Sequence, residues 1–354
     1  LFVLLLALPK YRQRKRQTGL GVLLALPGTL LFLSVLDPGW DAALSVVWVV
    51  AAQGIAGVAK DITKTASKSA IKITSVAGNA QLFRWVAWFT GSKNATKGLG
   101  FFIGGVLLDT AGFEPALWLM AAMLAAILVS CVAALPSGLG ISESSKSVRE
   151  LFGKSAGVNI LAAARIFMFG ARDVWFVVGL PVFLYSAGWD FWEVGGFLAV
   201  WTIAYGGIQA VAPSLVSRST DGLSREVPAA RVWAIFLTVI PALLVAGLQT
   251  GAVLPVPPAT VVVAGLMVFA IPFAVNSSLH SYLILAYAGS KKAAEDVGFY
   301  YAANAAGRLT GTLLSGLLYQ SGGLTGCLLG SLAMLLTCTA ITFALPRSAP
   351  RAAK

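Results

Sequence analysis

Two stretches of this sequence, KGLGFFIGGVLL (97–108) and RLTGTLLSGLLY (308–319), match each other position by position. The aligned pairs are Lys97 with Arg308, Gly100 with Gly311, and Gly105 with Gly316. Each stretch is otherwise apolar and long enough for about three helical turns. The match indicates a chain built from two related halves, and each half places a cation inside an apolar helix.

The composition is that of a helical membrane protein. The chain has 354 residues, of which 58% are hydrophobic and only 11% are charged. Soluble domains have about 25% charged residues. A bilayer-spanning helix needs roughly 20 consecutive apolar residues, and the chain supplies several such runs. We therefore predict an all-α integral membrane protein.

Hydropathy predicts ten complete spans and part of another. The spans are 18–36, 43–60, 84–108, 115–135, 158–185, 191–214, 231–248, 259–288, 296–319 and 323–345. Residues 1–9 are apolar but too short to cross a bilayer, and we interpret them as the end of a helix. The intact protein is then expected to have twelve helices, with the N-terminal part missing from this chain.

Basic residues occur in every second connection between these spans, and the intervening connections have none. The positive-inside rule therefore predicts a cytoplasmic C-terminus in a multi-pass protein of the plasma membrane, the bacterial inner membrane. The predicted parts are an N-terminal bundle (1–135), a cytoplasmic linker (136–157), a C-terminal bundle (158–346) and a cytoplasmic tail (347–354). Two such halves, related by an axis along the membrane normal, are typical of the major facilitator fold.

Several cations lie within the predicted spans. Lys97, Arg172 and Arg308 each fall about midway along a span, and Lys93 and Arg165 lie nearer the cytoplasm on the same helices. Ionisable side chains at this depth are costly and by default mark a substrate pathway. Because these side chains are positive, we predict an anionic substrate. The structural alternative is that a neighbouring Asp173 merely neutralises Arg172.

Polar side chains on two further spans complete the candidate substrate site. These are Asn276, His280 and Asn304, which could instead form hydrogen bonds between helices. Asp173 and His280 are candidates for proton coupling. Lys60 and Lys64 are candidates for an entry path, although the same side chains would suit contact with lipid phosphates.

Other classes are disfavoured by the sequence. The net charge of +12 is spread over short connections, which argues against nucleic acid as a partner. Three scattered cysteines and a single histidine form no metal-binding pattern, and no cofactor is expected. We find no catalytic constellation and predict that the chain is not an enzyme.

Long stretches of the chain resemble the organoarsenical efflux permeases of the ArsJ type, a branch of the major facilitator superfamily. The resemblance lies in GIAGVAKDITKTASKSAIK (54–72), LFRWVAWFTGSKNATKGLGFFIGG (82–105), ESSKSVRELFGKSAGVN (143–159), ARIFMFGARDVWFVVGLPVFLY (164–185), NSSLHSYLILAY (276–287) and EDVGFYYAANAAGRLTGTLLSGLLYQ (295–320). It covers essentially all of 45–345. The stretch from Tyr11 to Gly19 departs from the superfamily pattern, because it lacks the expected Asp.

The resemblance implies export of 1-arseno-3-phosphoglycerate, an arsenate ester of phosphoglycerate, and hence arsenate resistance. It also implies a functional link to a glyceraldehyde-3-phosphate dehydrogenase that makes the ester. The cations suit such a substrate, because Arg and Lys bind tetrahedral oxyanions. They would serve equally well in an exporter or antiporter of another organic phosphate or organic anion.

Overall fold

The computed structural model describes residues 26–37, 39–41, 43–57, 59, 96–134, 154–216, 219, 223–249, 256–287 and 293–347, and these residues are helical apart from turns and short connections. The predicted helix end 1–9, Lys60, Lys64, Lys93 and the tail after Arg347 lie outside this part of the chain. The chain divides into two compact units, residues 1–93 with 103–150, and residues 94–102 with 151–354. The domain boundaries drawn from the sequence stay a prediction.

In the first unit, helical segments cover 26–34, 43–57 and 103–111, followed by α5 (Phe113–Ala134). The helical residues 96–102 belong to the second unit. Leu33, Ala52 and Leu117 form a small buried core. The Trp48 ring stacks on Phe32 with 3.7 Å between ring centroids, and its indole N–H donates to the Phe32 carbonyl over 2.7 Å. These contacts join the first two segments.

The second unit contains α6 (Ala156–Phe176), α7 (Gly179–Ser186), α8 (Phe191–Val211), the 3-10 turn Ala212–Ser214, α9 (Glu226–Gln249), α10 (Pro258–Tyr287) and α11 (Ala293–Phe343). Within the described residues, six helices or helix pairs are long and apolar enough to cross a membrane. Most helix bounds agree with the predicted spans within a few residues, which confirms an all-α membrane architecture.

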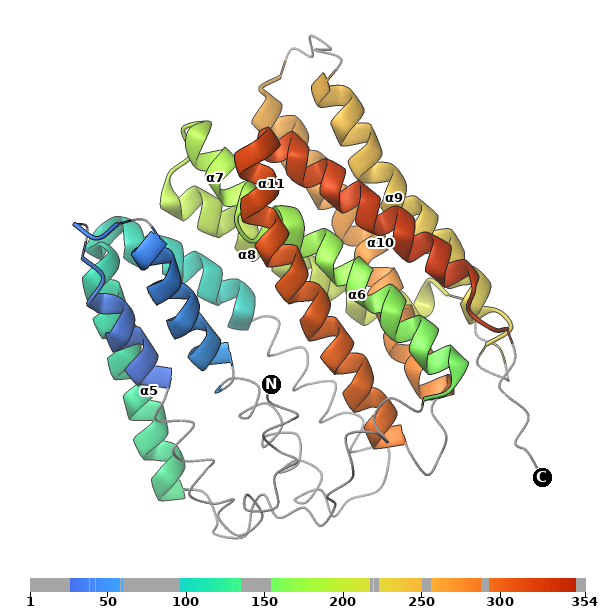
Figure 1. The fold of residues 1–354 in the computed structure, drawn as a ribbon, viewed down its shortest axis with the longest axis horizontal. Helices are drawn as coiled ribbons and strands as arrows, with labels where there is room; N and C mark the ends of the chain where they lie inside the picture. Colours follow the sequence, from blue (N-terminus) through green and yellow to red (C-terminus); the bar gives the residue numbers. More distant parts are fainter. Residues whose placement is uncertain are drawn as a thin grey trace. The chain divides into compact units, whose positions relative to one another are not determined.

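The predicted break between spans 296–319 and 323–345 is present in the structure, and another predicted span is interrupted. α11 carries both 296–319 and 323–345, and non-helical dihedrals at Gly322 and Gly323 separate it into two legs (Figure 1). Gly323 has φ of 57°, a conformation that favours glycine. The predicted span 158–185 is instead broken between α6 and α7. The Ser315 hydroxyl accepts the N–H groups of Val178 and Gly179 there, over 3.3 and 3.0 Å.

Helices α6 and α11 pack most closely in this unit (Figure 1). A Cβ added at Gly307 would lie 2.2 Å from the Ile166 carbonyl oxygen, and one at Gly311 would lie 2.4 Å from that of Gly170. Only glycine permits this approach of the two backbones. Gly311, which aligns with Gly100 in the sequence repeat, thus lies at the contact of the two helices.

At one end of the unit, contacts join chain segments that the sequence predicted to lie on the same side of the membrane. Lys154, before α6, pairs with Asp296 in the first turn of α11 over 3.1 Å. The Tyr287 hydroxyl at the end of α10 donates to the Pro346 carbonyl over 2.6 Å. Arg231, expected at the edge of a loop, lies inside α9 and donates to the Phe343 and Leu345 carbonyls. It therefore supports the carbonyl end of α11, where a cation is favoured.

Candidate functional site

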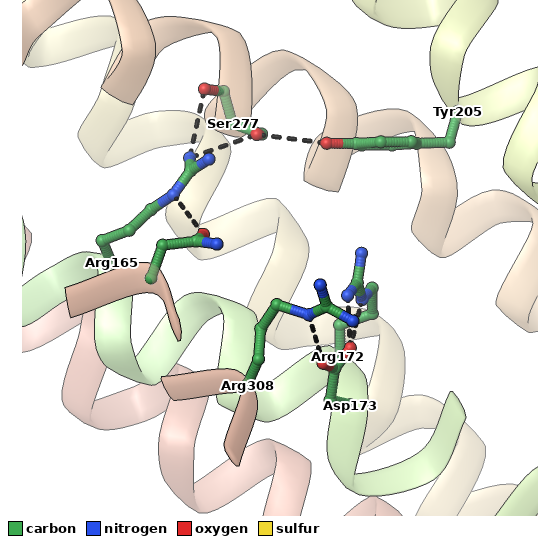
Figure 2. A network of polar contacts seen from close by, with 7 residues as sticks. Arg165, Arg172, Asp173, Tyr205, Ser277 and Arg308 are labelled. Carbon is green, nitrogen blue, oxygen red and sulfur yellow. Dashed lines mark hydrogen bonds and ion pairs between the residues drawn. The ribbon is translucent and has the colours of Figure 1, made fainter. Parts of the chain in front are cut away.

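Two arginines from different helices share one buried carboxylate (Figure 2). Arg172 Nε donates to Asp173 Oδ1 over 2.6 Å, and Arg172 Nη2 pairs with the same oxygen. Arg308 Nε, from α11, donates to Asp173 Oδ2 over 2.9 Å. The alternative that Asp173 neutralises its neighbour is confirmed, but the carboxylate also serves a second cation. The three residues together carry a net positive charge.

Burial differs sharply within this cluster. The Asp173 side chain is fully buried and that of Arg172 is 5% exposed, whereas that of Arg308 is 44% exposed. Arg308 uses only Nε for Asp173, so its two terminal nitrogens have no partner among the residues that the structure describes. A guanidinium binds an oxyanion through two parallel N–H groups. Arg308 is therefore the arginine of the cluster best placed to receive one.

Aromatic rings surround the Arg172 guanidinium. Its Cζ lies 5.1 Å from the Phe169 centroid, 5.5 Å from that of Phe273 and 5.7 Å from that of Phe176. Ring faces attract cations and exclude water. A desolvated guanidinium interacts more strongly with any anion that reaches it.

Arg165, two turns before Arg172 on α6, has different surroundings (Figure 2). Its Nε donates to Asn304 Oδ1 over 3.0 Å, and its Nη1 donates to the carbonyl and the hydroxyl of Ser277 over 3.3 and 3.1 Å. Its Cζ lies 3.9 Å from the Phe169 centroid and 4.9 Å from that of Tyr300. Asn304 and Arg165, predicted separately, are thus in direct contact.

The Ser277 hydroxyl is a meeting point for three helices. Besides Arg165 on α6, it accepts from Gln209 Nε2 over 3.2 Å and lies 3.3 Å from the Tyr205 hydroxyl, both on α8. The sequence analysis missed these two α8 residues. They are polar and one turn apart on an apolar helix, so they lie on one helix face. That pattern could have identified them.

Asn276 and His280, also predicted for the site, are fully buried on α10. Neither amide atom of Asn276 and neither ring nitrogen of His280 forms a hydrogen bond with any described residue. Buried polar atoms are nearly always partnered, so these four atoms need an explanation.

The remaining candidates are Lys97, Lys93, Lys60 and Lys64. Lys97 Nζ lies 5.5 Å from the Phe101 centroid on its own helix, and its side chain is exposed. Its role in binding stays a prediction, as do those of Lys93, Lys60 and Lys64 outside the described residues. Among the described residues, no three His, Cys, Asp or Glu side chains gather as metal ligands.

No family model and no curated protein matches this sequence. Solved structures do match. A bacterial homologue of the iron transporter ferroportin, in the outward-facing state, superposes with a TM-score of 0.60 at 15% identity, over 94% of this chain and 84% of that one. The human organic anion transporter MFSD10 (TETRAN) superposes with a TM-score of 0.57 at 17% identity, over 93% and 77%. The chain has the fold of these transporters, the major facilitator fold.

Proposed function

We propose that this chain is a secondary transporter that moves an organic oxyanion across the membrane by alternating access. The observation that carries the proposal is the junction of Arg172 and Arg308 on Asp173 between α6 and α11. Two guanidiniums with one carboxylate leave an excess positive charge in an apolar helical unit. An intramembrane charge of this kind is by default functional.

The geometry suggests how an anion would bind. Asp173 accepts a hydrogen bond from Nε of Arg308, and the outer edge of the Arg308 guanidinium is available to substrate. Arg172 is fixed by the carboxylate and by rings, so it supplies a constant positive field. Preorganised charges of this kind need little rearrangement on binding. Asp173 offsets one of the two positive charges when substrate is absent.

The fold supports the transport mechanism. Major facilitator proteins move substrate by rocking two helical bundles around a site near the bilayer midplane. By the helical rise, Arg172 lies roughly 24 Å from the start of α6, well inside a span. The likeness to an organic anion transporter and to an iron transporter homologue is one of fold. Arg165, Arg172 and Arg308 favour an anion over a metal cation.

The organoarsenical substrate is the finer part of the proposal. It rests on the sequence resemblance to ArsJ-type permeases, which implies export of 1-arseno-3-phosphoglycerate, supplied by a glyceraldehyde-3-phosphate dehydrogenase. The chemistry supports pentavalent arsenic, because trivalent arsenic prefers soft thiolate ligands. The two described cysteines, Cys327 and Cys338, are buried apart from the arginines on the second leg of α11. Export of another organic phosphate or organic anion is the alternative.

Uptake into everted membrane vesicles tests the function. The vesicles are supplied with the dehydrogenase, oxidised nicotinamide cofactor as hydride acceptor, the triose phosphate substrate and either arsenate or phosphate, and accumulated arsenic or phosphate is measured. We expect arsenic uptake that falls at least about tenfold in Arg308→Ala, since a charge-assisted contact is worth about 1.5–3 kcal/mol. The exposed Arg347 lies beyond α11, and Arg347→Ala is the matched control.

Three outcomes are distinguishable. Arsenic uptake that depends on Arg308 supports the organoarsenical assignment. Uptake of the phosphate product alone supports the alternative substrate class. If Arg308→Ala transports as well as the unchanged protein at equal abundance, the arginine cluster is not the transport site.

A further inference from the structure

Among the residues that the structure describes, Arg165 has no partner of opposite charge. Its side chain is buried, with 5% of the residue exposed, and its hydrogen-bond partners are an amide, a carbonyl and a hydroxyl, all neutral. Among the described residues, Lys154, Arg172 and Arg308 each pair with a carboxylate, whereas Arg165 does not. Buried charges are ordinarily paired with an opposite charge or neutralised.

The unused atoms around Arg165 are those that an anion would need. Arg165 Nη2 makes no hydrogen bond with any described residue, although Nε and Nη1 are both engaged. His280, three residues after Ser277 and on the same side of α10, is fully buried with both ring nitrogens unpartnered. The side-chain amide nitrogen and oxygen of Asn276, one turn before His280, also lack a hydrogen-bond partner among the described residues. A buried cation and unpartnered donors thus belong to one region.

This region is separate from the Asp173 cluster but adjoins it. The Phe169 ring contacts both guanidiniums, that of Arg165 at 3.9 Å and that of Arg172 at 5.1 Å. Seven residues of helix separate the two arginines by about 10 Å along the axis. Because one ring contacts both guanidiniums, the two cations are close enough for the two ends of one small molecule to reach them.

We infer that Arg165, with His280 and Asn276, forms a second oxyanion subsite, so that the transporter selects substrates with an oxyanion group at each end of a short carbon chain. The inference rests on the proposed function and deepens it. One oxyanion binds at Arg308 and Arg172, and the other binds at Arg165 Nη2 and supplies the missing negative charge. One ring N–H of His280 and the side-chain amide N–H of Asn276 donate to that second group.

Binding of two commercial probes by the purified full chain in nanodiscs tests this. 3-Phosphoglycerate carries an oxyanion group at each end of three carbons, and glycerol 3-phosphate carries only one. We expect the two-headed probe to bind at least about tenfold more tightly, as for one added charge-assisted contact. Arg165→Gln should bring the ratio of the two Kd values to about one, whereas the control Arg347→Gln should keep it.

A second variant covers the case in which Arg165→Gln fails to fold. His280→Leu changes no carboxylate or arginine and removes two unpartnered nitrogens. We expect it to retain or raise the Tm while lowering the ratio at least about threefold. A purely structural histidine would instead lower the Tm and leave the ratio intact, and that result would overturn the assignment.

The remaining outcomes separate this inference from the proposed function. If Arg308→Ala weakens both probes while Arg165→Gln keeps the ratio, the second subsite is wrong and the anion transporter stands. If Arg308→Ala binds both probes normally, the proposed function itself fails. If inorganic phosphate strengthens binding of glycerol 3-phosphate, Arg165 takes an independent ion, and a second head on the same substrate is excluded.

Discussion

At the scale of single residues, Asp173 holds the candidate site together. It is the fully buried acceptor for two guanidiniums on two helices, and one of these, Arg172, is itself buried. Removal of one partner from a buried ion pair leaves the other charge desolvated and uncompensated. The two arginines differ in how far solvent can relieve that cost, because Arg308 is 44% exposed.

Asp173→Asn should therefore destabilise the protein by about 3 kcal/mol, the usual cost of breaking a buried pair. Arg308→Ala should cost less than about 1 kcal/mol, because the exposed arginine is screened. Reversible unfolding in mixed micelles, at fixed pH and salt, measures both. The geometry indicates that the buried pair of Asp173 and Arg172 contributes most of this stability. Equal losses in the free energy of unfolding for the two variants would contradict that.

A second residue-scale prediction concerns Ser315. Its hydroxyl accepts the N–H groups of Val178 and Gly179 where α6 ends and α7 begins. Within a membrane these groups have no water to replace the serine. Ser315→Ala should lower the free energy of unfolding by about 1–3 kcal/mol. Ser331 is an equally buried serine whose hydroxyl lacks a partner among the described residues, so Ser331→Ala should cost nothing.

At the scale of helices, the approach of α6 and α11 decides whether the site exists. Arg308 reaches Asp173 because Gly307 and Gly311 let the two backbones touch on either side of it. A helix pair with larger residues at these positions would place the guanidinium farther from the carboxylate. The spacing of glycines on α11 is thus part of the binding machinery.

Gly311→Ala should separate the helices and destabilise the protein by about 1–3 kcal/mol, the usual cost of overpacking. The new Cβ would lie 2.4 Å from the Gly170 carbonyl oxygen, a backbone atom that cannot move alone. Gly316→Ala is the matched control on the same helix, because nothing lies within 4 Å of its Cβ. Its stability should be unchanged or slightly higher. Equal stability of the two variants would contradict the close approach.

At the scale of the whole molecule, the sidedness of the second unit can be tested directly. Contacts place the start of α6, the end of α10 and the end of α11 at one end of this unit. The basic residues predict that this end is cytoplasmic. The connection between α9 and α10 then belongs to the opposite side.

Reporter insertions should follow that division. Alkaline phosphatase inserted within 250–255 should be active, whereas the same enzyme in 288–292 or after Lys354 should be inactive. Green fluorescent protein should give the reverse pattern. If alkaline phosphatase is active after Lys354, the predicted side of the C-terminus is wrong. If it is active both in 288–292 and after Lys354 but inactive in 250–255, the predicted orientation of the whole unit is reversed.

The sequence by itself determined the membrane class, most span boundaries and the identity of the candidate cations. Those conclusions depend on local properties, because hydropathy and the spacing of Arg165 and Arg172 can each be read within one continuous helix. The folded structure was needed to show that Asp173 also pairs with Arg308, that Ser277 joins Arg165 to α8, and that Arg165 has no carboxylate partner among the described residues. Asp173 and Arg308 lie 135 residues apart. Helical periodicity shows which side chains share a face, but the facing helix is chosen by packing, here by the glycines between α6 and α11.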